Sequence, residues 1–166
     1  MEQQDEGMGQ VTASDEQLRE FMREAILEGK KALPACRPNP PVGCVLVRHG
    51  AIIARGYTQP PYQPHAEPFA LRQVEGELQD VTAFVTLEPC AFHQRTPSCA
   101  KEMIARRVGA VYVALLDPHP KNQGRGIQML RDAGIPVVTD FLSDEASPHL
   151  SPYLYGADGS EPDMGW

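Results

Sequence analysis

The chain has 166 residues and a net charge of −7 at neutral pH, which is long enough for one domain with a sizeable hydrophobic core. Hydrophobic residues make up 42% and charged residues 22%, as in an ordinary globular protein. The acidic balance argues against the basic surface that binds nucleic acid, so we expect no nucleic-acid partner.

No apolar run reaches the length of about 18 residues that a membrane span needs, and we expect no membrane association. The polar, acidic first residues do not resemble a signal peptide. We therefore expect a cytoplasmic protein. In that reducing compartment, cysteine spacing indicates metal binding or catalysis more often than disulfides.

Residues 1–13 are polar and without periodicity, which predicts a disordered N-terminal segment. Ser14 and Gln17 form a capping-box signal, and apolar residues then repeat at helical spacing to about Leu33. Two strands should follow at 43–47 and 51–57, joined by a tight turn into a hairpin.

Helices and strands alternate after a Pro-rich loop. The predicted elements are a helix at 64–76, a strand at 81–87, a helix from about Cys99 to 107, a strand at 110–116, a helix at 124–133 and a strand at 136–139. A hairpin followed by this alternation predicts an α/β layer fold with a mixed sheet, in which the last two strands run parallel. Residues 143–166 are rich in Pro, Gly, Ser and acidic residues and are interpreted as a tail.

One short motif, His65-Ala66-Glu67, combines with Cys90 and Cys99 into a set of potential zinc ligands. Zinc accepts nitrogen and thiolate ligands, and a catalytic zinc keeps three protein ligands and one open position. Zinc also lowers the pKa of a bound water to roughly 7. A carboxylate beside the metal, here Glu67, then moves protons during hydrolysis of an amidine-like ring carbon with loss of ammonia.

The geometry of this motif depends on a helix start. Residues two apart do not share a face inside a regular helix, so His65 and Glu67 converge only where a helix begins. Pro64 and the apolar residues after His65 fit such a start. Because Cys99 also precedes a predicted helix, we expect the metal to lie between two neighbouring helix starts.

A closed structural zinc site is the main rival, since His93 offers a fourth protein ligand. Cys36 and Cys44 are interpreted as small apolar residues, the second within a predicted strand.

The chain resembles the cytidine-deaminase-like zinc enzymes, most closely the deaminase domain of the bifunctional riboflavin-biosynthesis deaminase/reductase. The resemblance extends from Leu18 to Val138. Its motifs are Pro38-Asn39-Pro40-Pro41-Val42-Gly43, His65-Ala66-Glu67, Thr86-Leu87-Glu88-Pro89-Cys90, Arg95-Thr96-Pro97 before Cys99, Asp117-Pro118, Gly124-Arg125-Gly126 and Ala133-Gly134-Ile135. The eight residues between Cys90 and Cys99 distinguish it from transfer-RNA adenosine deaminases and cytidine deaminases, whose two cysteines are typically three apart.

The resemblance implies a three-layer α/β/α fold with a five-stranded mixed sheet, a zinc deaminase domain at 14–142 and a homodimer or higher homo-oligomer. No reductase sequence follows, so we expect one activity in this chain. His65, Cys90 and Cys99 would hold Zn²⁺, and Glu67 would carry protons.

The implied substrate is an aminopyrimidine, 2,5-diamino-6-ribosylamino-4(3H)-pyrimidinone 5′-phosphate, which would be deaminated. Asn39 would hydrogen-bond the heterocycle, and Arg95 with Thr96 would meet the ribose or phosphate end. Asp117 would contact the substrate or order the pocket.

Four positions depart from the family's common residues: Thr58 and Phe92 replace His, and Tyr62 and Gln94 replace Gly. These departures leave the zinc ligands and Glu67 in place, but they allow a substrate other than the one that the resemblance implies. One alternative is therefore a deaminase of a different nucleobase, nucleoside or pterin-like compound in secondary metabolism. The other is a non-catalytic zinc- or nucleotide-binding module.

Overall fold

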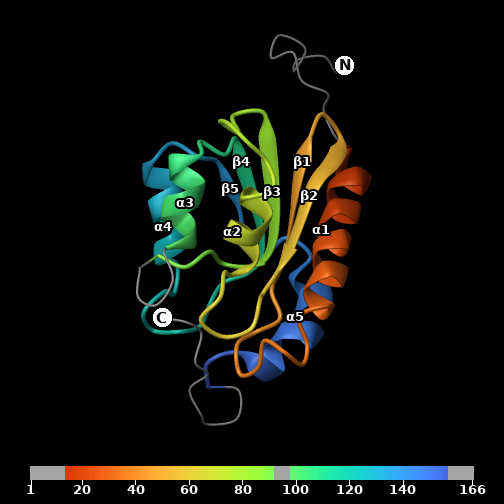
Figure 1. The fold of residues 1–166 in the computed structure, drawn as a ribbon, viewed down its shortest axis with the longest axis vertical. Helices are drawn as coiled ribbons and strands as arrows, with labels where there is room; N and C mark the ends of the chain where they lie inside the picture. The colour runs from red at the N-terminus through yellow and green to blue at the C-terminus, as the bar shows by residue number, and fades with distance from the viewer. Residues whose placement is uncertain (1–13, 92–97, 157–166) are drawn as a thin grey trace.

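The computed structural model describes residues 14–91 and 98–156. Within them, five strands form one sheet in the order β2-β1-β3-β4-β5 (Figure 1). The strands are β1 (Gly43–Arg48), β2 (Ala51–Tyr57), β3 (Val81–Leu87), β4 (Ala110–Leu115) and β5 (Val137–Val138). Strand β1 is antiparallel to β2 and β3, whereas β3, β4 and β5 are parallel, which confirms the predicted mixed sheet.

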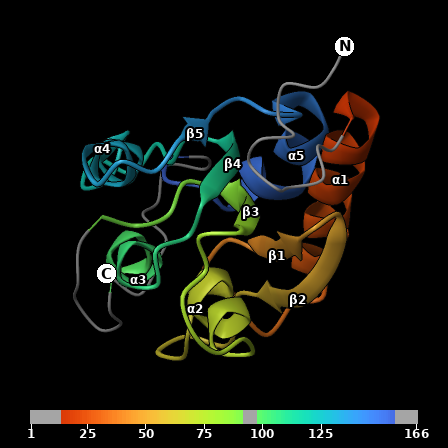
Figure 2. The same ribbon diagram turned by 90° about the horizontal axis from the view of Figure 1, so that it is seen from above.

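Helices cover both faces of the sheet (Figure 2). Helices α1 (Asp15–Lys30) and α5 (Ser143–Leu150) lie on one face, and α2 (Ala66–Leu71), α3 (Cys99–Ala105) and α4 (Arg125–Asp132) lie on the other. The three-layer α/β/α fold that the resemblance implies is therefore confirmed.

The first helix begins at the predicted capping box. The Ser14 hydroxyl accepts the Gln17 N–H at 3.2 Å, and the Gln17 side chain accepts the Ser14 N–H at 2.9 Å. The helix ends at Lys30, earlier than predicted, and turns lead from it into Pro34. A residue before proline avoids the helical region, which explains the early end.

The core centres on β1 and β3, which have helices on both sides. Val45, Leu46, Phe84 and Val85 are fully buried, as expected of strands covered on both faces. Helix α1 packs very closely on β1: a Cβ at Gly43 would lie 1.8 Å from the backbone oxygen of Ala25. This contact therefore requires glycine.

Two further elements differ from the sequence-based expectations. Helix α2 ends at Leu71 instead of continuing to Gly76; turns follow it, and Gly76 takes a positive φ of 83°. The segment after residue 142 begins with α5 and continues into a 3-10 turn, η2 (Ser151–Tyr153), and two α5 residues, Ala146 and Leu150, are buried in the core.

The predicted N-terminal segment 1–13 lies outside the described residues. Among the described helices, none combines the length and the apolar character that crossing a lipid bilayer requires.

Candidate metal centre

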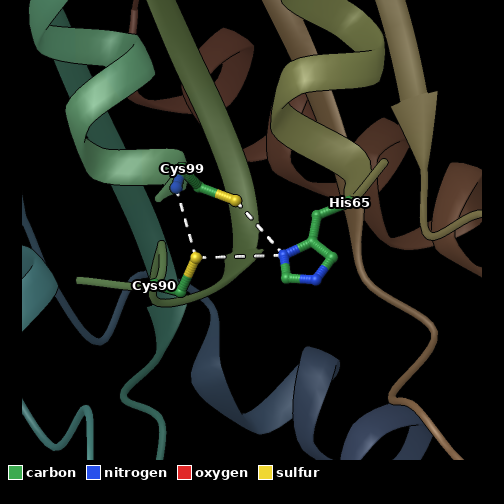
Figure 3. Close-up of side chains that lie close together, drawn as sticks. All are labelled: His65, Cys90 and Cys99. Carbon is green, nitrogen blue, oxygen red and sulfur yellow. Dashed lines mark hydrogen bonds between the residues drawn. The ribbon is translucent and has the colours of Figure 1, made fainter. Parts of the chain in front are cut away.

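Three side chains from separate parts of the chain point toward one another (Figure 3). His65 is the N-cap of α2, Cys90 lies in the loop after β3, and Cys99 is the first residue of α3. The Nδ1 atom of His65 lies 3.3 Å from the Cys99 sulfur and 3.9 Å from the Cys90 sulfur. The structure thus brings together the predicted ligands at two neighbouring helix starts.

These three side chains fit zinc. Tetrahedral zinc with bonds of about 2.3 Å to sulfur and about 2.0 Å to nitrogen separates a sulfur from a nitrogen ligand by about 3.5 Å. The two observed distances of 3.3 and 3.9 Å bracket this value, and the candidate ligand atoms all lie within 4.8 Å of one another. Of the described residues, only these three form such a cluster, while His93 lies outside the described residues.

Hydrogen bonds from α3 hold Cys90 in place. Its sulfur accepts the Cys99 N–H at 3.2 Å, and its carbonyl accepts the Ser98 hydroxyl at 2.9 Å and the Ala100 N–H at 3.0 Å. The hydrogen bond with the Cys99 thiol lowers the pKa of Cys90 and raises that of Cys99. Of the two cysteines, Cys90 is therefore the one that more readily forms a thiolate, the form in which cysteine binds a metal ion.

The other two cysteines have no such role. All four cysteines are free of disulfides, and Cys36 and Cys44 are fully buried. Burial raises the pKa of both thiols. Both behave as small apolar residues, as the sequence suggested.

Glu67 lies in the first turn of α2, two residues after His65, and is only 3% exposed. Burial raises its pKa to about 7, against the opposing influence of His65. A carboxyl that titrates near neutral pH both takes up and releases protons readily, which suits general acid–base catalysis. Glu67 lines the same pocket as His65 and Cys90.

Asn39 and Thr58 line this pocket as well. Asn39 is 4% exposed, and its side-chain oxygen has no hydrogen-bond partner among the described residues. A buried polar atom without a partner is costly, so this amide is free to receive a donor from a bound molecule. The Thr58 hydroxyl, in contrast, accepts the Val42 N–H at 3.0 Å.

Asp117, which follows β4, also lines the pocket. Its carboxylate accepts the His119 N–H at 3.0 Å and the Asn122 side-chain N–H at 3.3 Å. Burial raises its pKa to about 6. Because both bonds stay within the 117–122 loop, they favour the pocket-ordering role over substrate contact.

Other predicted positions are less informative. Arg95 and Thr96, like Phe92 and Gln94, lie outside the described residues. Tyr62 is 65% exposed and is not among the residues that line the pocket.

Sequence reasoning assigned no role to two buried polar residues beside the pocket, Glu88 and Asn122. Glu88 accepts backbone N–H groups from the segment 117–127, and Asn122 bridges that segment to residues 89–91. The placement of Glu88 directly before Pro89-Cys90 was a usable signal, whereas nothing in the sequence marks Asn122.

Comparison with known proteins agrees with this geometry. The family described as "Cytidine and deoxycytidylate deaminase zinc-binding region" matches residues 15–115. The riboflavin biosynthesis protein RibD of Chlamydia trachomatis is 45% identical over 135 residues, which are 81% of this chain and 36% of that protein. The chain thus spans about a third of the length of such relatives.

Solved structures of RibD and of a deaminase/reductase are also similar to this chain. Acinetobacter baumannii RibD, form 1, superposes with a TM-score of 0.78 at 43% identity, over 81% of this chain and 38% of that one. A Thermotoga maritima protein, titled a diaminohydroxyphosphoribosylaminopyrimidine deaminase/5-amino-6-(5-phosphoribosylamino)uracil reductase, also gives 0.78, at 35% identity, over 83% of this chain and 40% of that one.

The family match confirms zinc as the cofactor and a zinc-dependent deaminase as the class of enzyme. It extends over more than half of the chain and includes His65, Glu67, Cys90 and Cys99. This chain therefore belongs to the cytidine and deoxycytidylate deaminase zinc-binding family.

Proposed function

We propose that this chain catalyses the zinc-dependent hydrolytic deamination of an amino-substituted pyrimidine. The observation that carries the proposal is the arrangement of four residues in one place. His65, Cys90 and Cys99 converge as a three-ligand set, and Glu67 is buried in the pocket beside them. A closed structural site has no use for a buried acid that is not a ligand, which argues against a non-catalytic zinc module.

His65 Nδ1 and the sulfurs of Cys90 and Cys99 would hold the zinc ion. When bound, zinc makes water a competent nucleophile at neutral pH. The Glu67 carboxylate then takes a proton from the attacking water and delivers it to the ring nitrogen. It next takes the proton of the hydroxyl added to the ring carbon and passes it to the amine, which leaves as ammonia as the carbonyl forms. Asn39 orients the ring, since its side-chain oxygen, which has no partner among the described residues, accepts a ring or exocyclic N–H.

The most specific candidate substrate is 2,5-diamino-6-ribosylamino-4(3H)-pyrimidinone 5′-phosphate. Its support is the set of relatives named for riboflavin biosynthesis and the Thermotoga maritima protein named as a deaminase of a phosphoribosylaminopyrimidine. Arg95, with Thr96, would meet the ribose or phosphate end of this molecule. Only the deaminase part of such a bifunctional relative is proposed for this chain.

A deaminase of a different nucleobase, nucleoside or pterin-like compound is the second candidate. It is favoured by Thr58, a buried pocket residue where the resembled family commonly has His. Threonine is smaller, and its hydroxyl already accepts from and donates to the backbone of Val42, just before β1. A substrate that needs a donor at this position would therefore be bound less well.

Several further features are proposed along with the function. These are a deaminase domain at 14–142 between an N-terminal segment and a C-terminal segment whose first part, α5, packs into the core of that domain, a homodimer or higher homo-oligomer, and a cytoplasmic location. The described structure contains one copy of the chain, and size-exclusion chromatography with light scattering tests the assembly.

The function is tested by ammonia release from zinc-loaded protein. The substrates to compare are the diaminopyrimidine nucleotide, its nucleoside, cytidine, deoxycytidylate, pterins and free bases. We expect the fastest release from the diaminopyrimidine nucleotide. Faster release from a pterin or an unphosphorylated compound would favour the second candidate, and no release from any of them would contradict both.

A further inference from the structure

A third buried carboxylate, Glu88, lines the pocket with Glu67 and Asp117 and is only 3% exposed. Its Oε1 atom accepts the backbone N–H groups of Asp117 and Gly124, each at 3.0 Å. Its Oε2 atom accepts those of Gly126 at 3.0 Å and Ile127 at 3.3 Å.

These contacts use the whole acceptor capacity of Glu88. An ionised carboxylate has about four lone-pair positions, and four backbone donors fill them. No acceptor position is left for a substrate, although the residue lines the pocket. All four donors belong to the segment 117–127, which comprises the loop after β4 and the start of α4. A carboxylate is also favourable at a helix N-terminus.

Two further features lock this segment against the end of β3. The Asn122 side chain donates to the Pro89 carbonyl at 3.3 Å and accepts the Ala91 N–H at 3.1 Å. At Gly126, a Cβ would lie 1.8 Å from the Pro89 oxygen, so the backbones approach as closely as glycine allows. The wall of the pocket that carries Asp117 is therefore built onto residues 88–91.

Cys90 also has hydrogen bonds of its own. Its sulfur and carbonyl accept bonds from Ser98, Cys99 and Ala100, at the start of α3, and its sulfur lies 3.9 Å from His65 Nδ1. The metal-ligand side and the Asp117 side of the pocket thus meet at residues 88–91, and the side-chain hydrogen bonds of Glu88 all go to the Asp117 side.

We propose that Glu88 is a positioning residue: it fixes the Asp117 wall of the pocket relative to the metal ligands without touching the reacting atoms. This inference rests on the proposed deaminase function and extends it to a residue that acts through the segment 117–127. Its effect falls on how the substrate is held.

The test compares Glu88→Gln with Glu77→Gln in the full, zinc-loaded chain. Glutamine replaces one acceptor oxygen with an N–H₂ group, so two of the four backbone donors lose their partner. Glu77, which precedes β3 in the chain, is the matched control. Its side chain is 59% exposed and forms an ion pair with Arg107.

Three measurements are made on each variant. By NMR, amide exchange in Glu88→Gln should become faster at two or more of Asp117, Gly124, Gly126 and Ile127. The kcat/KM for the diaminopyrimidine nucleotide should fall roughly 10–100-fold, mostly through a higher KM. The absorption spectrum of the Co²⁺-substituted protein should stay unchanged, because the hydrogen bonds from Ser98, Cys99 and Ala100 to Cys90 do not involve Glu88. Glu77→Gln should match the wild type in all three.

Unchanged amide exchange in Glu88→Gln would overturn the anchoring role. Faster exchange with unchanged kcat/KM, or a loss confined to kcat with an altered Co²⁺ spectrum, would overturn the positioning role. If Glu88→Gln does not fold, amide exchange in the wild-type protein is the test. Rapid exchange of these four amides in the wild type would refute the proposal. A wild-type protein that releases no ammonia would remove the proposed function, while the exchange data would still judge the anchoring by Glu88.

Discussion

Replacing Glu67 with glutamine should lower the catalytic rate and, at alkaline pH, raise the stability of the metal-free protein. The change keeps the size of the side chain and removes its ability to carry a proton. General acid–base catalysis by a positioned side chain contributes about 10²–10⁴-fold. We therefore expect Glu67→Gln to bind zinc normally and to lose about two to four orders of magnitude in kcat, close to 3–5 kcal/mol of transition-state stabilisation.

The same substitution should stabilise the metal-free protein at alkaline pH. Burial raises the pKa of Glu67 from 4.5 to about 7. At about 1.36 kcal/mol per pH unit, this difference corresponds to at most about 3 kcal/mol. When folding raises the pKa of an acid, it disfavours the charged form of that acid. The contribution of Glu67 to stability is therefore greatest below pH 4.5 and is lost as the pH rises through 7.

Glutamine has no charge to bury, so its advantage should be absent near pH 4.5 and reach its maximum above pH 7. The assays are zinc content, ammonia release, and urea unfolding of the metal-free wild type and variant at pH 5 and 8. Two results would refute the reasoning: wild-type turnover in Glu67→Gln, or a variant that is less stable than the wild type at pH 8.

Three further substitutions test other parts of the account. Asn39→Ala should lower kcat/KM by about 10–100-fold, equivalent to about 1–3 kcal/mol for a lost buried partner, with little change in stability; a kcat/KM equal to the wild type would remove Asn39 from substrate binding. Arg95→Ala should raise the KM for a phosphorylated substrate much more than for its nucleoside, because a charge-assisted contact to phosphate is lost. Steady-state kinetics with both substrates measure this, and equal increases in the two KM values would disprove it. Gly43→Ala should destabilise the fold by about 1–3 kcal/mol or more in urea unfolding, since its Cβ would lie 1.8 Å from the Ala25 oxygen, and an unchanged midpoint would show that α1 moves away at no cost.

The sequence predicted the sheet well because its strands carry local signals. The runs at 51–57 and 81–87 are strands with those bounds, and the hairpin turn falls at His49 and Gly50, both with positive φ. The metal cluster was predictable for a related reason. His65 and Cys99 each stand at a helix start that local patterns mark, and helix starts on one face of a sheet can meet.

The part that the sequence could not predict depends on tertiary contacts. Helix α5 contains Pro148 and lies in a stretch rich in Pro, Gly, Ser and acidic residues, so its local sequence signals are those of a tail. It is helical because Ala146 and Leu150 are buried in the core, which overrides weak propensity. The bonds of Glu88 join residues 29–39 positions apart, and only the packing of α4 against the sheet brings them together.

The central claim is that His65, Cys90 and Cys99 hold a zinc ion that works with Glu67 on an aminopyrimidine. The direct measurement is ammonia release from the diaminopyrimidine nucleotide by zinc-loaded, chelator-stripped and zinc-restored protein. We predict one ammonia per substrate consumed, loss of activity on stripping, and recovery on addition of Zn²⁺. Protein that binds one zinc ion yet releases no ammonia from this or any other aminopyrimidine would contradict the claim.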